Sequence, residues 1–127
     1  MSPVTVKLGF VPSYRSRWTE WTAKMRDESL AAMRRLAKVE VVVPHPLQEG
    51  EEPSAERGTT RHGAVQNLDE AEVVAEFFAR QHVDGLVLCP LDFGDERSAA
   101  KIAEKLGVPV LLYATKEPPA HDHPSMA

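Results

Sequence analysis

Polar and aromatic side chains gather in four segments of the sequence, and each segment follows a short apolar run. Arg, Asp and Glu side chains can bond the hydroxyl groups of a ligand, and an aromatic ring can pack against the apolar side of a sugar. This mixture favours a polyhydroxylated ligand, although polar residues are also ordinary in surface loops. The candidate binding residues are Tyr14, Arg15, Arg17, Trp18, Arg61, His62, Asp92, Phe93, Lys116 and Glu117.

Cys89 is the one cysteine of the chain. An intrachain disulfide is therefore impossible, which is typical of a protein of the reducing cytoplasm. A two-thiol racemase on a similar sheet would need a second cysteine as the opposing acid or base. We interpret Cys89 as a small buried apolar residue. A less favoured hypothesis is a small isomerase that uses this thiol as its acid/base group.

Histidine and carboxylate residues do not predict a metal site in this chain. His121, Asp122 and His123 are good ligand types, but they lie in a terminal segment flanked by prolines, where nothing holds their geometry. His45 and His62 lack carboxylates at helical or strand spacing that could complete a site. We therefore expect that this chain itself binds no cofactor.

Nucleotide and phosphate motifs are absent from the sequence. Residues 9–14 lack the later glycines of a dinucleotide fingerprint, and no Walker pattern of Gly, Lys and Ser/Thr occurs. A response-regulator receiver would carry a phosphorylatable Asp where this chain has Cys89. It would also carry an acidic pair where this chain has Pro12 and Ser13. These observations argue against all three classes.

Short β-branched runs alternate with amphipathic segments, which is the pattern of βα units on a parallel sheet. We predict an α/β fold with a parallel four-stranded sheet flanked by helices, a flavodoxin-like or Rossmann-like three-layer sandwich of strand order 2-1-3-4. Ligands of such sheets bind at the carboxyl ends of the strands. The predicted strands are residues 5–11, 39–43, 86–89 and 110–113, and the predicted helices are residues 18–36, 69–82 and 94–107. The segments expected at the carboxyl edge are residues 12–18, 44–66, 90–94 and 114–118.

Residues 44–66 contain prolines, glycines and acids without any period, so we expect a long exposed loop. The helix that follows has a recognisable start. Asp69 is the predicted N-cap, Glu72 follows three residues later, and Leu68 is placed to pack on Val73.

Residues 110–113 are apolar enough for a strand buried on both faces, yet no covering helix follows them. We therefore expect a further part of a longer protein, or a neighbouring subunit, to cover that edge. The predicted domain spans residues 1–118, and residues 119–127 are predicted to be a flexible tail.

Composition is that of one globular domain. The chain has 127 residues, of which 43% are hydrophobic and 27% charged, and this balance excludes a disordered or fibrous protein. A net charge of −4 with scattered basic residues argues against nucleic acid as a partner. No apolar run is long enough to span a membrane and no export signal is visible, so we predict a cytoplasmic protein.

Several motifs resemble the N-terminal domain of the L-fucose isomerase and L-arabinose isomerase-like family. The opening of the chain, residues 8–12 followed by Arg15 and Arg17, is similar as well. The resemblance extends over nearly the whole chain. The motifs are residues 84–88 (DGLVL), 92–96 (DFGDE), 107–113 (GVPVLLY) and 115–118 (TKEP).

The resemblance implies part of a metal-dependent aldose-ketose isomerase, whose divalent ion, usually Mn²⁺, is held by later domains. This chain would then be a substrate-recognition and oligomerisation domain of a homo-oligomer, not catalytically complete alone. The resemblance places Arg15 or Arg17, and Phe93 and Glu96, at the sugar. Val11 departs from the pattern, because fucose isomerases tend to have Arg there. A function of a different class is a self-contained sugar-binding or regulatory domain.

Overall fold

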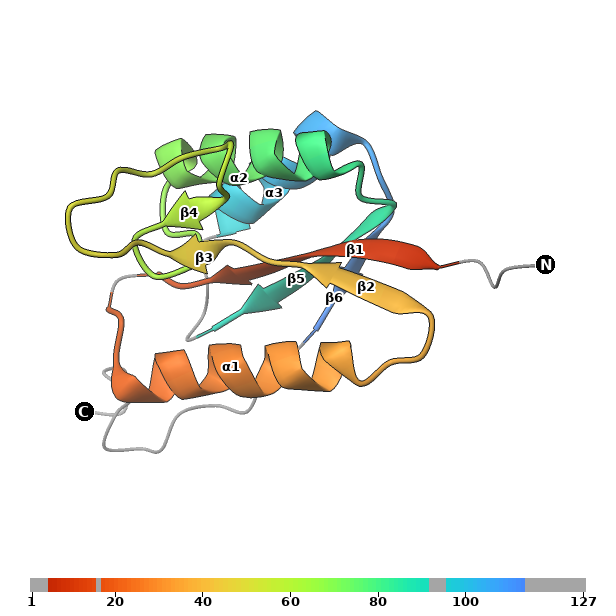
Figure 1. Cartoon of the computed structure of the whole chain (residues 1–127), viewed down its shortest axis with the longest axis horizontal. Helices are drawn as coiled ribbons and strands as arrows, with labels where there is room; N and C mark the ends of the chain where they lie inside the picture. Colours follow the sequence, from red (N-terminus) through yellow and green to blue (C-terminus); the bar gives the residue numbers. More distant parts are fainter. Residues whose placement is uncertain (1–4, 16, 92–95, 114–127) are drawn as a thin grey trace.

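The computed structural model describes residues 5–15, 17–91 and 96–113 of the chain. Its main sheet is parallel throughout and lies between two helical layers, with one helix on one face and two on the other (Figure 1). In spatial order the strands are β2 (Val39–Val42), β1 (Val6–Ser13), β5 (Gly85–Pro90) and β6 (Val110–Leu112). The helices are α1 (Glu20–Arg34), α2 (Leu68–Gln81) and α3 (Glu96–Leu106).

The predicted parallel four-stranded α/β sheet is confirmed. Its order by chain numbering is 2-1-5-6 and not 2-1-3-4, because two short strands intervene. These are β3 (His45–Pro46) and β4 (Thr59–Thr60), which pair in parallel as a second small sheet. The prediction of a uniformly exposed loop over residues 44–66 was therefore wrong in part. The tip of this loop is exposed, whereas Gly58, Thr59, Thr60 and residues 63–65 are buried.

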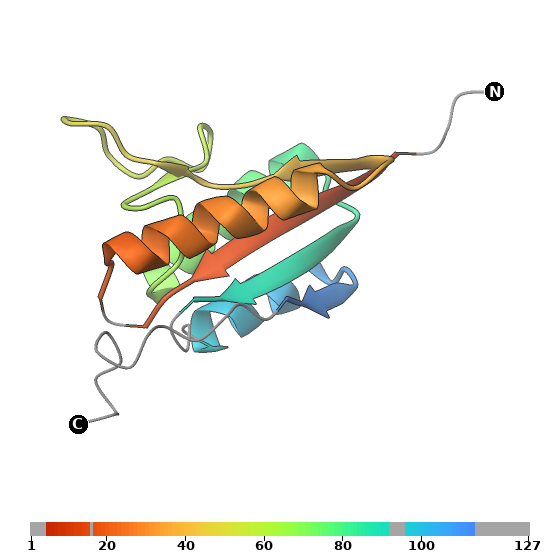
Figure 2. The same ribbon diagram turned by 90° about the horizontal axis from the view of Figure 1, so that it is seen from below.

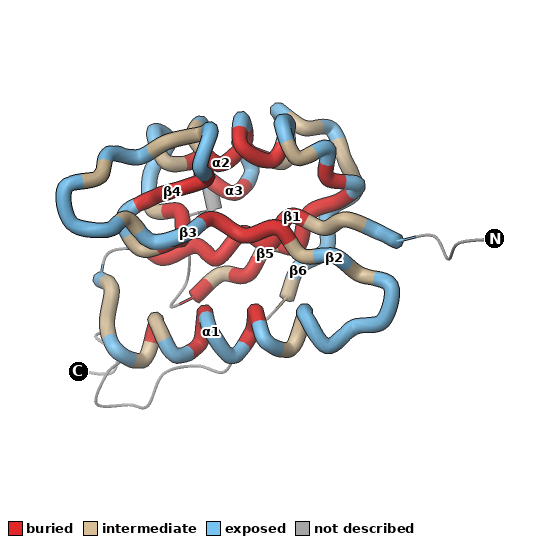
Figure 3. Tube along the Cα trace, viewed as in Figure 1, coloured by how far each residue is buried: buried red, intermediate tan, exposed pale blue. Residues whose placement is uncertain are grey.

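The core lies on both faces of β1 and β5, as the buried residues of Figure 3 show. Neighbouring residues of a strand point to opposite faces. Phe10 and Val87 therefore pack with α1, while Val11 and Leu86 pack with α2 and α3. This two-sided burial explains the nearly continuous apolar character of the two central strands.

Two helix starts differ from their predicted positions. Helix α1 begins at Glu20, because Thr19 and Thr22 form a reciprocal capping box, so Trp18 precedes the helix. Helix α2 is capped by Asn67 and not by Asp69, since the Asn67 side chain accepts from the Glu70 backbone N–H. The sequence contains two overlapping capping patterns here, one at Asn67 and one at Asp69, and the structure uses the one at Asn67.

Three local predictions for the helices can also be compared with the structure. Leu68 is the first residue of α2 and is exposed, so it does not hold the position before the N-cap from which it was expected to pack on Val73. The first helix was predicted to continue to Leu36, but Leu36 lies beyond the end of α1 and is 49% exposed. The predicted stop at Gly107 is confirmed, with a left-handed φ of 60°.

The apolar residues of strand β6 were expected to need cover that no later helix of this chain provides, and in the structure they are exposed. Val110, Leu111 and Leu112 are 42%, 64% and 74% exposed. The reason is that β6 is an edge strand: β5 is its one neighbour in the described sheet. Helix α1 does not cover it either, because that helix lies over the side of the sheet that holds β1 and β2 (Figure 2). None of the described helices is long and apolar enough to cross a membrane.

Candidate functional site

Three of the predicted binding residues form an aromatic cluster beyond the carboxyl end of β1. The Trp18 and His62 rings are stacked, with centroids 4.7 Å apart and an interplanar angle of 3°. The Tyr14 ring meets Trp18 edge-on at 5.0 Å and His62 at 5.8 Å. Tyr14 is buried, whereas Trp18 and His62 are half-buried. The cluster therefore presents parts of two rings to solvent, on a buried aromatic base.

Tyr14 is held at the end of β1 by backbone hydrogen bonds. The chain near Val65 extends the sheet beyond the strand: Val65 N–H donates to Pro12 O at 2.8 Å, and Tyr14 N–H donates to Val65 O at 3.1 Å. The end of β5 is tied to the same place, since Leu91 N–H donates to Ser13 O at 2.7 Å. The carboxyl ends of two central strands thus form a continuous base for the cluster.

His62 sits on a tight turn formed by residues 60–64. The buried Thr60 hydroxyl accepts from Ala64 N–H at 3.0 Å and donates to Ala64 O at 2.8 Å. Gly63 N–H donates to Thr60 O at 3.3 Å. Both ends of the turn are therefore bonded, and the His62 ring within it stacks on Trp18.

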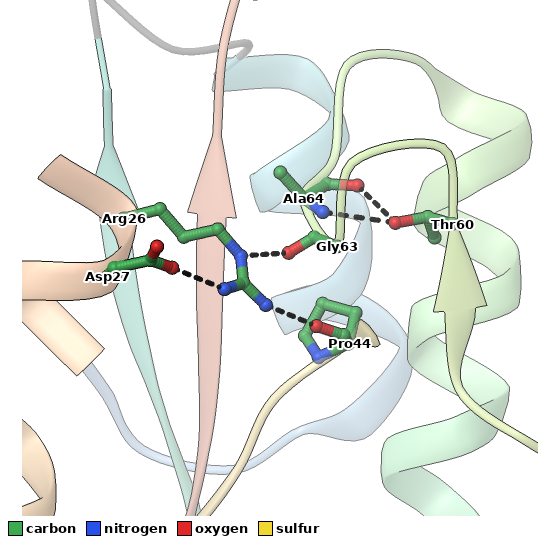
Figure 4. Close-up of polar contacts among 6 residues, drawn as sticks. All are labelled: Arg26, Asp27, Pro44, Thr60, Gly63 and Ala64. Carbon is green, nitrogen blue, oxygen red and sulfur yellow. Dashed lines mark hydrogen bonds and ion pairs between the residues drawn. The ribbon is translucent and has the colours of Figure 1, made fainter. Parts of the chain in front are cut away.

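Arg26 of α1 joins this turn to the end of the β2 segment (Figure 4). Its guanidinium Nε donates to Gly63 O at 2.9 Å, and Nη2 donates to Pro44 O at 2.8 Å. Nη1 pairs with Asp27 at 2.9 Å. Sequence reasoning missed Arg26, although a signal was present: it lies one helical turn after Thr22 and one before Leu30, both on the buried face of α1.

Burial and nearby charges change the acid-base properties of the cluster. Burial raises the pKa of Tyr14, with a further contribution from Glu70, while Arg61 opposes the change. Burial also lowers the pKa of His62 below its usual 6.5, and the positive charge of Arg61 adds to this effect. The phenol and the imidazole are therefore both neutral at pH 7. A neutral imidazole can donate one hydrogen bond and accept another.

Three arginines neighbour the residues of the aromatic cluster in the sequence: Arg15 follows Tyr14, Arg17 precedes Trp18, and Arg61 precedes His62. Arg15, Arg17 and Arg61 are exposed, and no ion pair joins any of them to another described residue. Glu70 has a local structural role, because its carboxylate accepts from Gln66 N–H at 2.9 Å and from Arg61 N–H at 3.4 Å. The aromatic rings can pack against the apolar face of a ligand, and the guanidinium groups can donate hydrogen bonds to oxygen atoms of that ligand.

The remaining predicted residues of the site cannot be assigned to this cluster. Asp92, Phe93, Lys116 and Glu117 lie outside the described residues, as do His121, Asp122 and His123. Glu96 begins α3, and its side chain is outside the described part. Within residues 5–15, 17–91 and 96–113, no group of three His, Cys, Asp or Glu side chains could hold a metal ion.

Cys89 lies apart from the aromatic cluster, on the α1 face of β5. It is fully buried among Phe10, Met25 and Leu91. Burial raises the pKa of its thiol to about 11, and a hydrogen bond with Ser29 offsets this only in part. A protonated and inaccessible thiol suits the interpretation as a core residue and not an acid/base role.

The comparisons with known proteins identify the family of the chain. Neither the search of curated proteins nor that of solved structures gave a significant match. The family model described as fucose/sulfoquinovose isomerase, N-terminal domain, matches residues 9–125. This match includes all the strands and helices that follow the first residues of β1. The chain therefore belongs to the fucose/sulfoquinovose isomerase N-terminal domain family.

Proposed function

We propose that this chain recognises the sugar substrate of an aldose-ketose isomerase, and that the metal chemistry resides in other domains or in a neighbouring subunit of a cytoplasmic homo-oligomer. The stacked Trp18 and His62 rings on buried Tyr14 are the observation that carries this proposal. They lie where ligands of open parallel sheets bind, beyond the carboxyl ends of the central strands.

The chemistry of the cluster suits a sugar. One side of a pyranose or furanose ring is lined by C–H groups, which can pack on the exposed parts of Trp18 and His62. The hydroxyl groups at the edge of the sugar can accept from the guanidinium groups of Arg15, Arg17 and Arg61. Neutral His62 can bond a hydroxyl group in either direction.

The groups that the structure describes around the cluster do not fit Mn²⁺. A hard divalent cation takes several oxygen ligands, often with carboxylates among them. Glu70 is the carboxylate whose charge reaches Tyr14, and both of its oxygens already accept from backbone N–H groups. We therefore assign no step of the isomerisation to a metal held by these residues.

A fluorescence titration tests the proposal. Trp21→Phe leaves Trp18 as the one tryptophan, because the chain has two. We expect a saturable change in Trp18 emission with L-fucose or sulfoquinovose, without added Mn²⁺, and no change with an uncharged polyether of similar size. His62→Ala in the same background should weaken the response, because the stacked partner is lost.

Two outcomes would contradict the proposal. The first is an unchanged Trp18 emission, together with an unchanged unfolding temperature, at every sugar concentration up to saturation of the solution. The second is aldose-ketose interconversion at enzyme-like rates by this chain alone with Mn²⁺, since a complete catalyst would need metal ligands of its own. Leu112→Ser is a matched control, because Leu112 is exposed on the β6 edge and should leave the titration unchanged.

A further inference from the structure

We propose that Arg26 is a positioning residue for this sugar site: its guanidinium holds the turn of residues 60–64, and thereby the His62 ring on Trp18, without touching the sugar. The inference rests on the proposed function, since it concerns how the same cluster is made ready for a ligand. Arg26 is only 7% exposed, and its guanidinium points at the backbone carbonyls of Gly63 and Pro44 (Figure 4).

The bonds of Arg26 explain why a buried cation is placed there. A guanidinium is planar and always charged, and it donates in fixed directions. Two of its nitrogens donate to backbone carbonyls of separate segments, Gly63 O at 2.9 Å and Pro44 O at 2.8 Å. An apolar side chain would fill the same space without joining these carbonyls. The guanidinium therefore sets the distance of the turn from α1 and from the end of β2.

The ion pair with Asp27 is not the main reason for the buried guanidinium. The Asp27 side chain is 73% exposed, and such a pair is weakened by solvent. The two carbonyl bonds are buried. The carbonyl bonds, rather than the carboxylate, are thus the contacts through which Arg26 acts on the turn.

Gly63 shows how closely the turn fits the guanidinium. A Cβ atom at this position would lie 2.7 Å from Arg26 Nη2 and 2.9 Å from Pro44 O. Gly63 also has a left-handed φ of 65°, which favours glycine. It directly follows His62, so the carbonyl that Arg26 binds is one peptide unit away from the residue that stacks on Trp18.

Arg26 also borders a hollow of about 500 Å³ between α1 and His45, which offers an alternative explanation for its presence. Arg34 borders the same hollow from the last turn of α1 and is exposed. No hydrogen bond to a described residue of the turn is made by Arg34. The variant Arg34→Gln is therefore a matched control: it changes the charge of the hollow and leaves the turn in place.

The experiment compares Arg26→Met, Arg26→Lys and Arg34→Gln with the parent chain, by NMR titration of His62 and by sugar titration. In Arg26→Met we expect nuclear Overhauser effects between His62 and Trp18 to weaken, the His62 pKa to rise toward 6.5, and sugar affinity to fall roughly tenfold or more. Arg26→Lys should give values between those of the parent chain and Arg26→Met. The lysine ammonium can donate to one of the two carbonyls, but it lacks the planar arrangement of nitrogens with which the guanidinium bonds both. Arg34→Gln should match the parent chain in all three measurements.

The inference is overturned if folded Arg26→Met keeps the parent's His62 pKa and its Overhauser effects to Trp18. Should Arg26→Met fail to fold, the same test applies to Arg26→Lys, which keeps the buried charge; unchanged His62 signals there also overturn the inference. The NMR measurements need no ligand. If the parent chain binds no sugar while the His62 signals still respond to Arg26, the proposed function fails and the positioning role stands.

Discussion

The carboxyl end of β1 and the outer edge of β6 are built in opposite ways. At β1, buried polar groups are paired one by one, as Thr60 with Ala64 and Arg26 with two carbonyls. At β6, apolar side chains face solvent, and Leu112 is 74% exposed. Hydrogen bonds are directional and therefore stabilise a single arrangement. Burial of apolar surface is favourable whatever the geometry of the surface that covers it. The first region therefore holds one geometry, as the proposed sugar recognition needs, whereas none of the described residues covers the second.

Each region contains a glycine with positive φ, and replacing these two glycines by alanine should lower the free energy of unfolding by different amounts. Gly63→Ala should lower the free energy of unfolding by about 2–5 kcal/mol, because a left-handed alanine costs about 1–2 kcal/mol and crowding adds about 1–3 kcal/mol. The crowding arises at Arg26 Nη2, 2.7 Å from the added Cβ. Urea unfolding monitored by circular dichroism measures the loss.

Gly107→Ala, next to β6, is the control for backbone strain. Its φ is 60°, and apart from Gly107 and its two chain neighbours no described residue has an atom within 4 Å of the added Cβ. We expect a loss of about 1–2 kcal/mol from strain alone. Equal losses in the two variants would show that the turn at Gly63 is not closely packed around the guanidinium.

Thr60→Val should cost about 1–3 kcal/mol, since it leaves the N–H and the C=O of buried Ala64 without their partner. Thr60→Ser keeps the hydroxyl and should lose no more than about 0.8 kcal/mol, for one methyl group. Thermal unfolding gives both values, and hydrogen exchange at the Ala64 amide should accelerate only in the valine variant. A serine variant as unstable as the valine variant would argue against the role of the hydroxyl.

Leu112→Ser should change the free energy of unfolding of the chain by less than about 0.5 kcal/mol, because the side chain is exposed. Leu86→Ala on neighbouring β5 should cost about 2–5 kcal/mol, because Leu86 is fully buried. Urea unfolding at low protein concentration compares the two. A large loss in Leu112→Ser would mean that β6 is covered in solution, and light scattering would then show whether a second copy covers it.

The smallest expected effect is the pH dependence from His62, because its ring is half-exposed. Its pKa is lowered in the folded state, so the unfolded state takes up the proton first as pH falls through 6.5. Stability should therefore decrease from pH 6.5 down to the folded pKa, and change no further below it. His62→Gln should remove this part of the pH dependence, as measured by unfolding temperature between about pH 8 and about pH 5. Identical profiles for the two proteins would contradict the lowered pKa.

Much of the fold could be predicted because its signals are local. The apolar run 86–89 was assigned to a central strand, and Gly107 to a helix end, and both are confirmed. The rule that ligands meet the carboxyl ends of strands also brought Tyr14, Trp18 and His62 into one list, although they come from two separate loops. Their contact is observed, and their role toward a sugar stays a prediction.

Other features could not be predicted because they depend on which of several local choices the tertiary structure favours. Asn67 and Asp69 are both residue types that favour the N-cap position, and Asn67 takes it. With the helix starting there, the Glu70 carboxylate accepts from the backbone N–H groups of Gln66 and Arg61. The strands β3 and β4 are each two residues long, too short to give a periodic signal. Their pairing exists only where the chain folds back on itself.

The sequence by itself determined the parallel α/β class, the central strands and the loops that meet at their ends, because hydrophobic periodicity and turn residues act over a few neighbouring positions. The tertiary structure alone decided that Arg26 is buried against Gly63 and Pro44, and how far each apolar side chain of β6 is exposed. Both outcomes depend on segments distant in sequence. The Arg26 guanidinium can be buried because those segments supply carbonyl acceptors for it. The leucines of β6 are exposed because no described segment covers them.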